Sequence, residues 1–512
     1  MIEENKSSMK NSVRRLIIAG IGVLIQIIWV VVLVMRLNQY SQIITLLTVA
    51  IELVLVLAVY SMDTNAAFKL PWIILITVAP IVGICVFFLF GRSGATKKVR
   101  ARYRKIDQQL FAYLNQDEQI IEELSKKDER LANDFKYLWK CASSPVYKNT
   151  DVKYYGDTCD AMAAQLEDMM QAKKFIFLEY HAIEMAESFQ ALRKVLMAKA
   201  REGVEIRILY DDAGCIGFLN PRFIKYMESM GIQCRVFNPI MPVLNIFMNN
   251  RDHRKITVID GKVAYTGGYN LADEYFNITH PYGQWKDSGI RFEGDAVQTA
   301  TILFLEMWNA LREQDVDIEK YLPVYPYKAK EQGFFALYGD SPLDKEPAGE
   351  NVYMNLLRHA KKYIYFTTPY LILSDEMTRE LTGAAKRGVD VRIITPGIPD
   401  KKTIFQVTKS YYPQLLKHGV KIYEYTPGFM HEKQCICDGE IVVVGTINLD
   451  FRSLYLHFEN AALFCGYEAV SHVKEDFDAL FPICNDMSKE PSERTRRLRL
   501  SQLILRLFSP LM

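Results

Sequence analysis

The sequence predicts an α/β protein with two repeated domains related by pseudo-twofold symmetry, preceded by N-terminal transmembrane helices. Three observations predict this: a motif that occurs twice, a strand and helix pattern that repeats around it, and long apolar runs near the N-terminus. The expected parts are a membrane region with two or three transmembrane helices (1–95), a juxtamembrane helical linker (96–150), a first repeat domain (151–325), a second repeat domain (326–490) and an amphipathic C-terminal segment (491–512).

Composition narrows the class of protein. A chain of 512 residues is long enough for two or three domains. Its 62 Lys and Arg against 60 Asp and Glu do not indicate a nucleic-acid-binding protein. Its nine cysteines are scattered and odd in number, so they do not form a disulfide framework and they favour a reducing compartment.

Three apolar segments in the N-terminal region are candidates for membrane spans: Leu16–Met35, Ile43–Tyr60 and Trp72–Phe90. The second segment is the weakest because it is the shortest and carries Glu52 in its middle. A carboxylate at that depth is either functional or neutralised, for example against Gln26 on the neighbouring helix.

Basic residues flank the membrane region on both sides, four within 1–15 and seven within 92–105. The positive-inside rule would place both ends in the cytoplasm, which three spans do not allow. We expect a multi-pass membrane protein with the repeat domains in the cytoplasm, because the second cluster is larger and free thiols suit a reducing compartment. The basic start of the linker either lies near anionic headgroups or is a solvated helix face.

The repeated motif reads H-x-K-x4-D, at His253–Asp260 and again at His431–Asp438. Each copy is followed by a glycine and an asparagine at equal spacing, Gly267 and Asn270 in the first half, Gly445 and Asn448 in the second. Further strings repeat, with 173–178 matching 361–366 and 203–208 matching 388–393. Each half therefore predicts a strand, a helix, a strand, the motif strand, a turn and another strand, and the Pro- and Gly-rich segment Val324–Glu350 is the expected junction.

Strand periodicity explains the motif's spacing. His253 and Lys255 point to one face of a strand, as do His431 and Lys433. Asp260 and Asp438 begin Asp-Gly turns, where the carboxylate can cap its own backbone, so we interpret them as mainly structural with a possible share in catalysis. A side chain at Gly267 or Gly445 would obstruct a close approach to a ligand.

These motifs resemble those of the phospholipase D superfamily, in which two such halves build one active site, and the wider context is similar to bacterial cardiolipin synthases. The strings that carry the resemblance cover nearly the whole chain and are Asn250–Lys255, Tyr265–Asn270, Trp285–Asp287, Thr368–Tyr370, Pro427–His431 and Asn448–Ser453. The resemblance implies two phospholipase D-like domains, phosphatidylglycerol and anionic membrane lipids as partners, and no cofactor. It also implies a location in the bacterial plasma membrane, with the catalytic domains in the cytoplasm. The sequence departs from the family's pattern at Asp252, Glu432 and His457 and in having Cys435 and Cys437 where aliphatic residues are usual, which bears on substrate preference or rate.

The residue types suit phosphodiester chemistry. Lys255, Lys433, Asn270 and Asn448 can neutralise a phosphodiester and donate to it. One neutral histidine can attack phosphorus and the other can give a proton to the leaving alkoxide. The residues alone do not distinguish the two; the resemblance implies that His253 attacks and His431 is the acid/base.

Each histidine needs a carboxylate that orients it. We expect Asp287 to serve His253 and Glu459 to serve His431, because each follows its own histidine by a comparable interval, 34 and 28 residues.

Other chemistries find less support. The thiols of Cys435 and Cys437 share a face with His431, but we expect them in the core rather than on a metal. The sequence holds no P-loop and no dinucleotide fingerprint, and we expect no bound metal.

Two segments indicate contact with lipid. The apolar loop Phe237–Met248 is either a lip that enters lipid or a buried loop, and Leu500, Leu503, Ile504, Leu507 and Phe508 form an apolar helical stripe flanked by arginines. The stripe either lies on the membrane or docks on the protein.

The resemblance implies a reaction that moves a phosphatidyl group between two phosphatidylglycerol molecules, giving cardiolipin and glycerol through a phosphohistidine. A phospholipase D-type hydrolase and a phosphatidylserine synthase would use the same residues. A lipid-binding scaffold and a nuclease are further alternatives, and the paired motifs, the near-neutral charge and the apolar segments argue against them.

Overall fold

The computed structural model describes residues 42–91, 97–219, 222–240, 249–312, 317–322, 325–489 and 500–511, with isolated residues between 21 and 35. Most of the first expected span, the central part of the apolar loop (241–248) and the flanking arginines Arg496, Arg497 and Arg499 lie outside the described residues.

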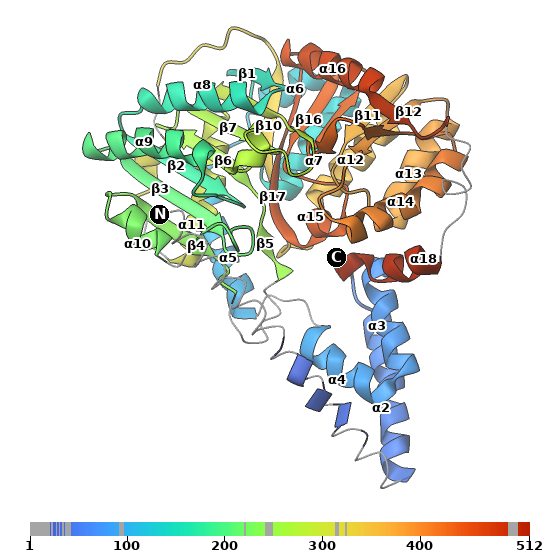
Figure 1. Cartoon of the computed structure of the whole chain (residues 1–512). Helices are drawn as coiled ribbons and strands as arrows, with labels where there is room; N and C mark the ends of the chain where they lie inside the picture. The colour runs from blue at the N-terminus through green and yellow to red at the C-terminus, as the bar shows by residue number, and fades with distance from the viewer. Residues whose placement is uncertain are drawn as a thin grey trace.

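The first repeat domain contains a seven-stranded sheet in the order β1-β9-β7-β6-β2-β3-β4 (Figure 1). Its strands are β1 (Thr150–Tyr155), β2 (Phe175–Tyr180), β3 (Glu205–Asp211), β4 (Gln233–Phe237), β6 (Lys255–Ile259), β7 (Val263–Gly267) and β9 (Gly289–Gly294). The helices α8 (Thr158–Met170), α9 (Glu187–Arg201) and α10 (Phe223–Glu228) pack with one face of this sheet in a single hydrophobic cluster.

The second domain repeats the strand order as β10-β17-β16-β15-β11-β12-β13 and adds β18 at the edge. Its strands are β10 (Phe334–Asp340), β11 (Tyr363–Thr367), β12 (Asp390–Pro396), β13 (Lys421–Tyr425), β15 (Gln434–Cys437), β16 (Ile441–Gly445), β17 (His457–Cys465) and β18 (Cys484–Asp486). Its helices are α12 (Ala348–His359), α13 (Asp375–Lys386), α14 (Lys402–Lys417), α15 (Phe451–Tyr455) and α16 (Ala469–Leu480). The equal strand orders confirm the internal duplication.

The junction expected at 324–350 is not a plain linker. It contains β10, which pairs along its whole length with β17, and the start of α12. The apolar run Phe334–Leu337 explains this, because all four side chains are buried between the cores. The second domain's sheet therefore begins inside the predicted junction.

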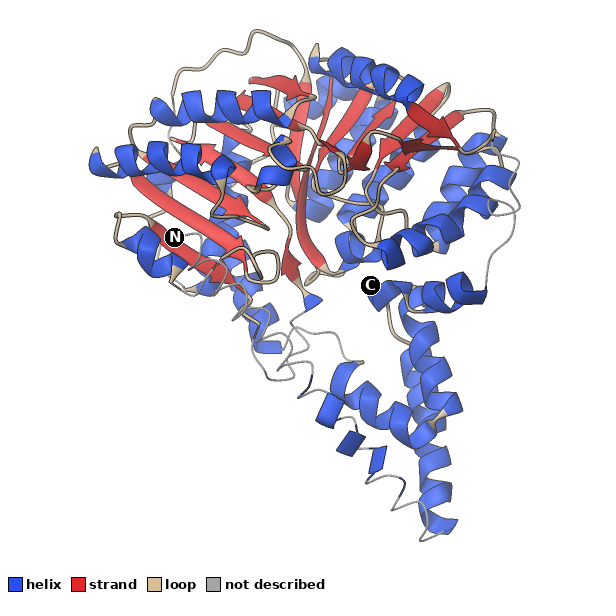
Figure 2. Ribbon diagram, in the orientation of Figure 1, coloured by secondary structure: helices blue, strands red, loops and turns tan. Residues whose placement is uncertain are grey.

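One hydrophobic core joins the inner faces of the two sheets, which Figure 2 shows as two groups of strands with helices on their outer faces. The helix α11 (Val297–Leu311) lies in this core, and thirteen of its residues are buried. Short 3-10 helices connect the elements: η1 (Phe111–Tyr113), η3 (Asp273–Phe276), η4 (Glu319–Tyr321), η5 (Phe481–Ile483) and η6 (Ser509–Leu511).

The segment 96–150 is helical as expected, but it is not a free linker. It forms α5 (Lys97–Leu110), α6 (Glu118–Lys127) and α7 (Glu129–Ala142), whose apolar faces are buried in the cores of the repeat domains. Tyr103 of α5, for example, stacks on Phe458 with ring centroids 5.3 Å apart. Burial of these faces against the domains makes the helices part of the same folded body as the two repeat domains.

The N-terminal helices α2 (Gln42–Tyr60), α3 (Ala66–Val78) and α4 (Pro80–Phe90) project from this body (Figure 1). Within the described residues, no helix combines the length and the apolar character that crossing a membrane requires. The third expected span is divided between α3 and α4 at Ala79, which leaves helical geometry before Pro80. The transmembrane prediction is therefore not confirmed here.

The C-terminal helix α18 (Leu500–Leu507) exists as predicted and lies against α14 with one face. Gln502 is buried there, and the Arg506 guanidinium lies 4.1 Å from the centre of the Tyr411 ring. The predicted stripe faces outward instead, with exposed Leu500, Leu503, Ile504 and Phe508. The helix thus docks on the protein and still presents an apolar surface.

The aspartates of the two motifs fold each domain in the same way. Both have φ of 54° in tight turns, a conformation that aspartate tolerates better than most residues. Asp260 accepts hydrogen bonds from the backbone N–H groups of residues 173, 174 and 175 at 2.7–2.9 Å, and Asp438 from those of residues 361, 362 and 363 at 2.8 Å. Each carboxylate therefore caps the start of the neighbouring strand. We had expected it to cap the backbone of its own turn.

We predict that Asp438→Ala lowers the free energy of unfolding by about 2–4 kcal/mol, because three backbone donors lose a charged acceptor. Glu440→Ala is the matched control, since Glu440 lies exposed in the same turn. Chemical denaturation of the purified full chain measures both. Equal losses of the free energy of unfolding in the two variants would contradict this capping role of Asp438.

Candidate active site

Two short parallel strand pairs between the domains build the site. The strand β5 (Arg251–Asp252) pairs with the start of β17, and His253 N–H donates to the carbonyl of Phe458 at 2.9 Å. The strand β8 (Gln284–Lys286) pairs with β14 (Gly428–Met430), and His431 N–H donates to the carbonyl of Lys286 at 2.8 Å. In each pair the next residues along the two strands are a motif histidine and a carboxylate of the opposite domain.

The carboxylates are therefore exchanged between the domains. His253 Nδ1 lies 2.9 Å from both carboxylate oxygens of Glu459, and His431 Nδ1 lies 2.5 Å from Oδ2 of Asp287. The predicted acids are the correct residues, but their assignment to the histidines was wrong. It was wrong because the acid aligned with each histidine stands on the opposite domain's strand. Nδ1–H donation to the acid leaves Nε2 of each ring free to act on a substrate.

Both motif lysines occupy equivalent positions, as the spacing predicted. Lys255 Nζ donates to the carbonyl of His253 at 2.7 Å, and Lys433 Nζ donates to the carbonyl of His431. Both side chains are buried, and the Lys433 ammonium also lies 2.7 Å from His431 Nδ1. The site thus concentrates two cations and two imidazoles in a space with little water.

Burial controls the protonation of these groups. It lowers the pKa of Lys255 to about 7, against the attraction of Glu459, and the pKa of Lys433 to about 8, against that of Asp287. Burial and then Lys433 lower the pKa of His431 to about 3, and burial and then Lys255 lower that of His253 well below its ordinary value. An anion bound among these groups would raise all four pKa values, because it favours the charged forms.

The two motif asparagines differ in their contacts with the protein. Asn270 accepts from the Ala182 N–H at 3.1 Å and donates to the Tyr275 hydroxyl at 2.8 Å. The Asn448 Oδ1 is buried with no hydrogen-bond partner in the described part of the chain. Each amide retains N–H capacity, so donation to a phosphate oxygen stays a prediction.

Asp260 and Asp438 do not reach the histidines. Asp260 comes seven positions after His253, which corresponds to roughly 20 Å along a strand. Both carboxylates are engaged with backbone donors at the far end of the motif strand. Their role is structural, and the catalytic share that we had allowed for them is not supported.

The motif glycines make room for neighbouring protein and not for a ligand. A Cβ on Gly267 would lie 2.4 Å from the Ser288 carbonyl, and one on Gly445 would lie 2.5 Å from Ala461. A Cβ on Gly268 would lie 2.0 Å from the Asp287 carboxylate. The glycines thus let the segments that carry the two acids lie close to the ends of β7 and β16, the strands that follow the motif strands.

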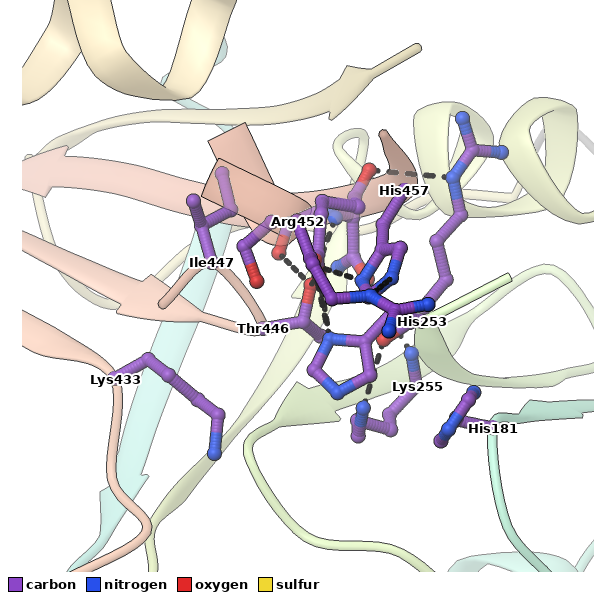
Figure 3. Close-up of polar contacts among 12 residues, drawn as sticks. His181, His253, Lys255, Lys433, Thr446, Ile447, Arg452 and His457 are labelled. Atoms are coloured by element: carbon purple, nitrogen blue, oxygen red, sulfur yellow. Dashed lines mark hydrogen bonds and ion pairs between the residues drawn. The ribbon is translucent and has the colours of Figure 1, made fainter. Parts of the chain in front are cut away.

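Several side chains in the site were not assigned a role from the sequence (Figure 3). The rings of His181 and His457 lie 5.0 and 5.5 Å from that of His253, and Thr446 donates to Glu459. His181 directly follows β2, and a polar residue at the carboxyl end of a parallel strand is a signal that could have found it. His457 had been noticed only as a departure from the family pattern.

Glu432 and the two cysteines of the second motif have structural surroundings. The buried Glu432 lies 2.6 Å from Lys286 Nζ and so links the two domains beside Asp287. Cys435 and Cys437 are buried in the second domain's core, which raises the pKa of both thiols. Among the described residues, the group with metal-ligand spacing is His253, His457 and Glu459, which does not include the cysteines.

We predict that affinity for sulfate falls as pH rises from 7 to 9. Over this interval Lys255 and Lys433 lose their protons, since their pKa values are about 7 and 8, whereas sulfate keeps its charge. Calorimetric titration of the full chain measures the affinity. Lys361→Gln, at an exposed lysine far from the site, should leave the profile unchanged. An affinity that is constant or rises up to pH 9 would contradict the described electrostatics.

Comparison with known proteins places this geometry in a family. The family described as "Cardiolipin synthase, PLD-like domain" matches residues 166–308 and 353–481, one match in each repeat domain. A cardiolipin synthase of Halalkalibacterium halodurans is 32% identical over 93% of this chain and 94% of its own length. Cardiolipin synthase 2 of Bacillus anthracis is 30% identical over 86% of each chain.

A protein of Streptococcus mutans serotype c is 39% identical over 90% of this chain and 99% of its own length. The crystal structure of a phosphatidylserine synthase from Haemophilus influenzae Rd KW20 shares the fold, with a TM-score of 0.53 and 14% identity over 70% of this chain and 93% of that one. The family matches cover both motifs, and the relatives span most of the chain. The protein belongs to the cardiolipin synthase family of phospholipase D-like enzymes.

Proposed function

We propose that this enzyme transfers the phosphatidyl group of one phosphatidylglycerol to a second, giving cardiolipin and glycerol. Family membership makes the chain a phosphatidyltransferase. The observation that carries the mechanism is the pair of buried histidines, each bound through Nδ1 to a carboxylate of the opposite domain.

In the first step, His253 Nε2 attacks phosphorus, and the bond from phosphorus to the glycerol oxygen breaks. His431 gives its proton to the leaving oxygen, so free glycerol departs and a phosphatidyl-histidine remains. We assign attack to His253 by resemblance to the superfamily. The bound phosphodiester supplies the negative charge that raises the pKa of His431 enough for it to carry this proton.

In the second step, a headgroup hydroxyl of another phosphatidylglycerol attacks the same phosphorus. The bond from phosphorus to His253 breaks, and the hydroxyl proton passes to His431, which returns to its starting state. One phosphodiester is broken and one is formed, so the reaction needs no nucleotide. Lys255 and Lys433 stabilise the charge on the phosphoryl oxygens in both steps.

The surroundings of His431 favour transfer over hydrolysis. The rings of Tyr275 and Trp285 lie 5.1 Å from that of His431, and the ring of Phe429 lies 5.8 Å away. This aromatic wall limits the room for water beside the proposed acid/base. Exclusion of water protects a phosphohistidine until an alcohol arrives.

Attachment to the membrane is part of this proposal. The helix α2 exposes apolar side chains such as Leu46, Leu53 and Leu57, and α18 exposes Leu500 and Ile504. Contiguous exposed apolar surface of this kind marks an interaction site. We propose that both helices contact lipid, with α2–α4 as an integral anchor and the catalytic domains on the cytoplasmic side of a bacterial plasma membrane.

We predict that purified full-length protein converts phosphatidylglycerol vesicles into cardiolipin and glycerol in equal amounts, without added nucleotide or serine. Mass spectrometry measures both products. His253→Ala should abolish turnover, whereas His472→Ala, at a histidine outside the site, should leave it unchanged.

Phosphatidic acid as the sole lipid product would replace the proposal with a hydrolase. Turnover only with a CDP-lipid and serine would replace it with a phosphatidylserine synthase.

A further inference from the structure

The two histidines have unlike surroundings although the domains repeat each other. Aromatic rings line His431, whereas the polar side chains of His181, Arg452 and His457 gather near His253 (Figure 3). The duplication does not explain this, because Trp285 and His457 occupy equivalent places two residues before the exchanged acids. One side of the site is therefore apolar and the other is polar.

Hydrogen bonds fix the two additional imidazoles. His181 Nδ1 lies 2.7 Å from the carbonyl of Asp252, which cannot donate, so His181 carries its proton there and exposes an Nε2 acceptor. The Arg452 Nε–H donates to His457 Nε2 at 3.3 Å. His457 therefore keeps its proton on Nδ1, which lies 3.5 Å from Glu459. Both imidazoles are neutral, and burial lowers their pKa values.

Arg452 forms no ion pair within the described part of the chain, although Asp450 attracts it from a greater distance. By contrast, the neighbouring Arg251 lies 3.3 Å from the buried carboxylate of Asp211. Among the residues that the structure describes, no carboxylate lies within ion-pair distance of the Arg452 guanidinium, whose side chain donates to the neutral His457. Burial lowers the pKa of Arg452 against the attraction of the more distant Asp450 carboxylate, and the Arg251 charge adds to the lowering.

Such an arrangement is unfavourable until an anion arrives. A largely buried charge loses its hydration, and a bonded neutral imidazole replaces only part of that loss. The guanidinium is planar and offers paired N–H groups that match two phosphate oxygens. Because Nε is held by His457, the outer N–H groups have a fixed direction.

We propose that Arg452, oriented by His457, binds the phosphodiester of the acceptor lipid while His253 carries the phosphatidyl group. His181 Nε2 accepts a hydrogen bond from the acceptor's glycerol headgroup. This inference rests on the proposed function and deepens it, because it assigns a separate subsite to the second phosphatidylglycerol.

The reaction needs such a subsite for an electrostatic reason. Donor and acceptor each carry a negative phosphodiester, and the product holds the two phosphates one glycerol unit apart. Lys255 and Lys433 serve the reacting phosphate, so a further cation is required to offset repulsion by the second. Free glycerol and water carry no phosphate, so the Arg452 charge does not stabilise their binding.

Two assays on the same full-length protein separate the subsites. Exchange of labelled glycerol into phosphatidylglycerol vesicles reports formation of the phosphohistidine and its attack by an alcohol without phosphate. Cardiolipin synthesis from the same vesicles requires the acceptor phosphate as well. We predict that Arg452→Gln lowers cardiolipin synthesis about ten- to hundredfold and changes glycerol exchange less than about threefold.

Arg452→Lys keeps the charge and should retain more cardiolipin synthesis than Arg452→Gln. Arg358→Gln, at an exposed arginine of α12, is the matched control and should change neither assay. The proposed subsite would be refuted if both Arg452 variants lost cardiolipin synthesis and glycerol exchange to the same extent. It would also be refuted if neither variant lost either reaction. A wild-type protein that makes no cardiolipin would instead refute the proposed function.

Discussion

The structure depends on two short parallel strand pairs that cross the domain interface. They set the register between β5 and β17 and between β8 and β14, and the residues that follow are a histidine and a carboxylate in each case. Backbone hydrogen bonds from His253 and His431 extend the pairing by one residue. Neither domain alone therefore contains a complete histidine and acid pair, so the chemistry requires the joined core.

The two domains follow the pseudo-twofold symmetry in their frame and depart from it in the surroundings of the two motif histidines. The strand order, the capping of a neighbouring strand by Asp260 and Asp438, and the positions of the motif lysines agree between the domains. The residues two places before the exchanged acids differ, with Trp285 beside His431 and His457 beside His253. The proposed transferase uses one lipid as donor and another as acceptor. Unlike surroundings of the two histidines suit this reaction, because the donor releases its glycerol headgroup and the acceptor keeps its own.

Much of the fold and most of the reacting groups could be predicted from the sequence, since strand periodicity and an internal repeat are local signals. The pairing of each histidine with the acid of the other domain could not be predicted. The intervals of 34 and 28 residues measure separation along the sequence, whereas the pairing is made between the domains. The strand β10 was not predicted, because the residues around it are rich in Pro and Gly and indicated a junction. Arg452 and His181 escaped assignment because their proximity to His253 arises only in the folded chain.

The measurement that tests the exchanged pairs most directly is nitrogen NMR of labelled histidine side chains in the full-length protein. Glu459→Gln should shift the Nδ1 resonance of His253 and leave that of His431 in place, and Asp287→Asn should do the reverse, because each acid accepts one ring's proton. A shift of His431 in Glu459→Gln, or of His253 in Asp287→Asn, would contradict the account.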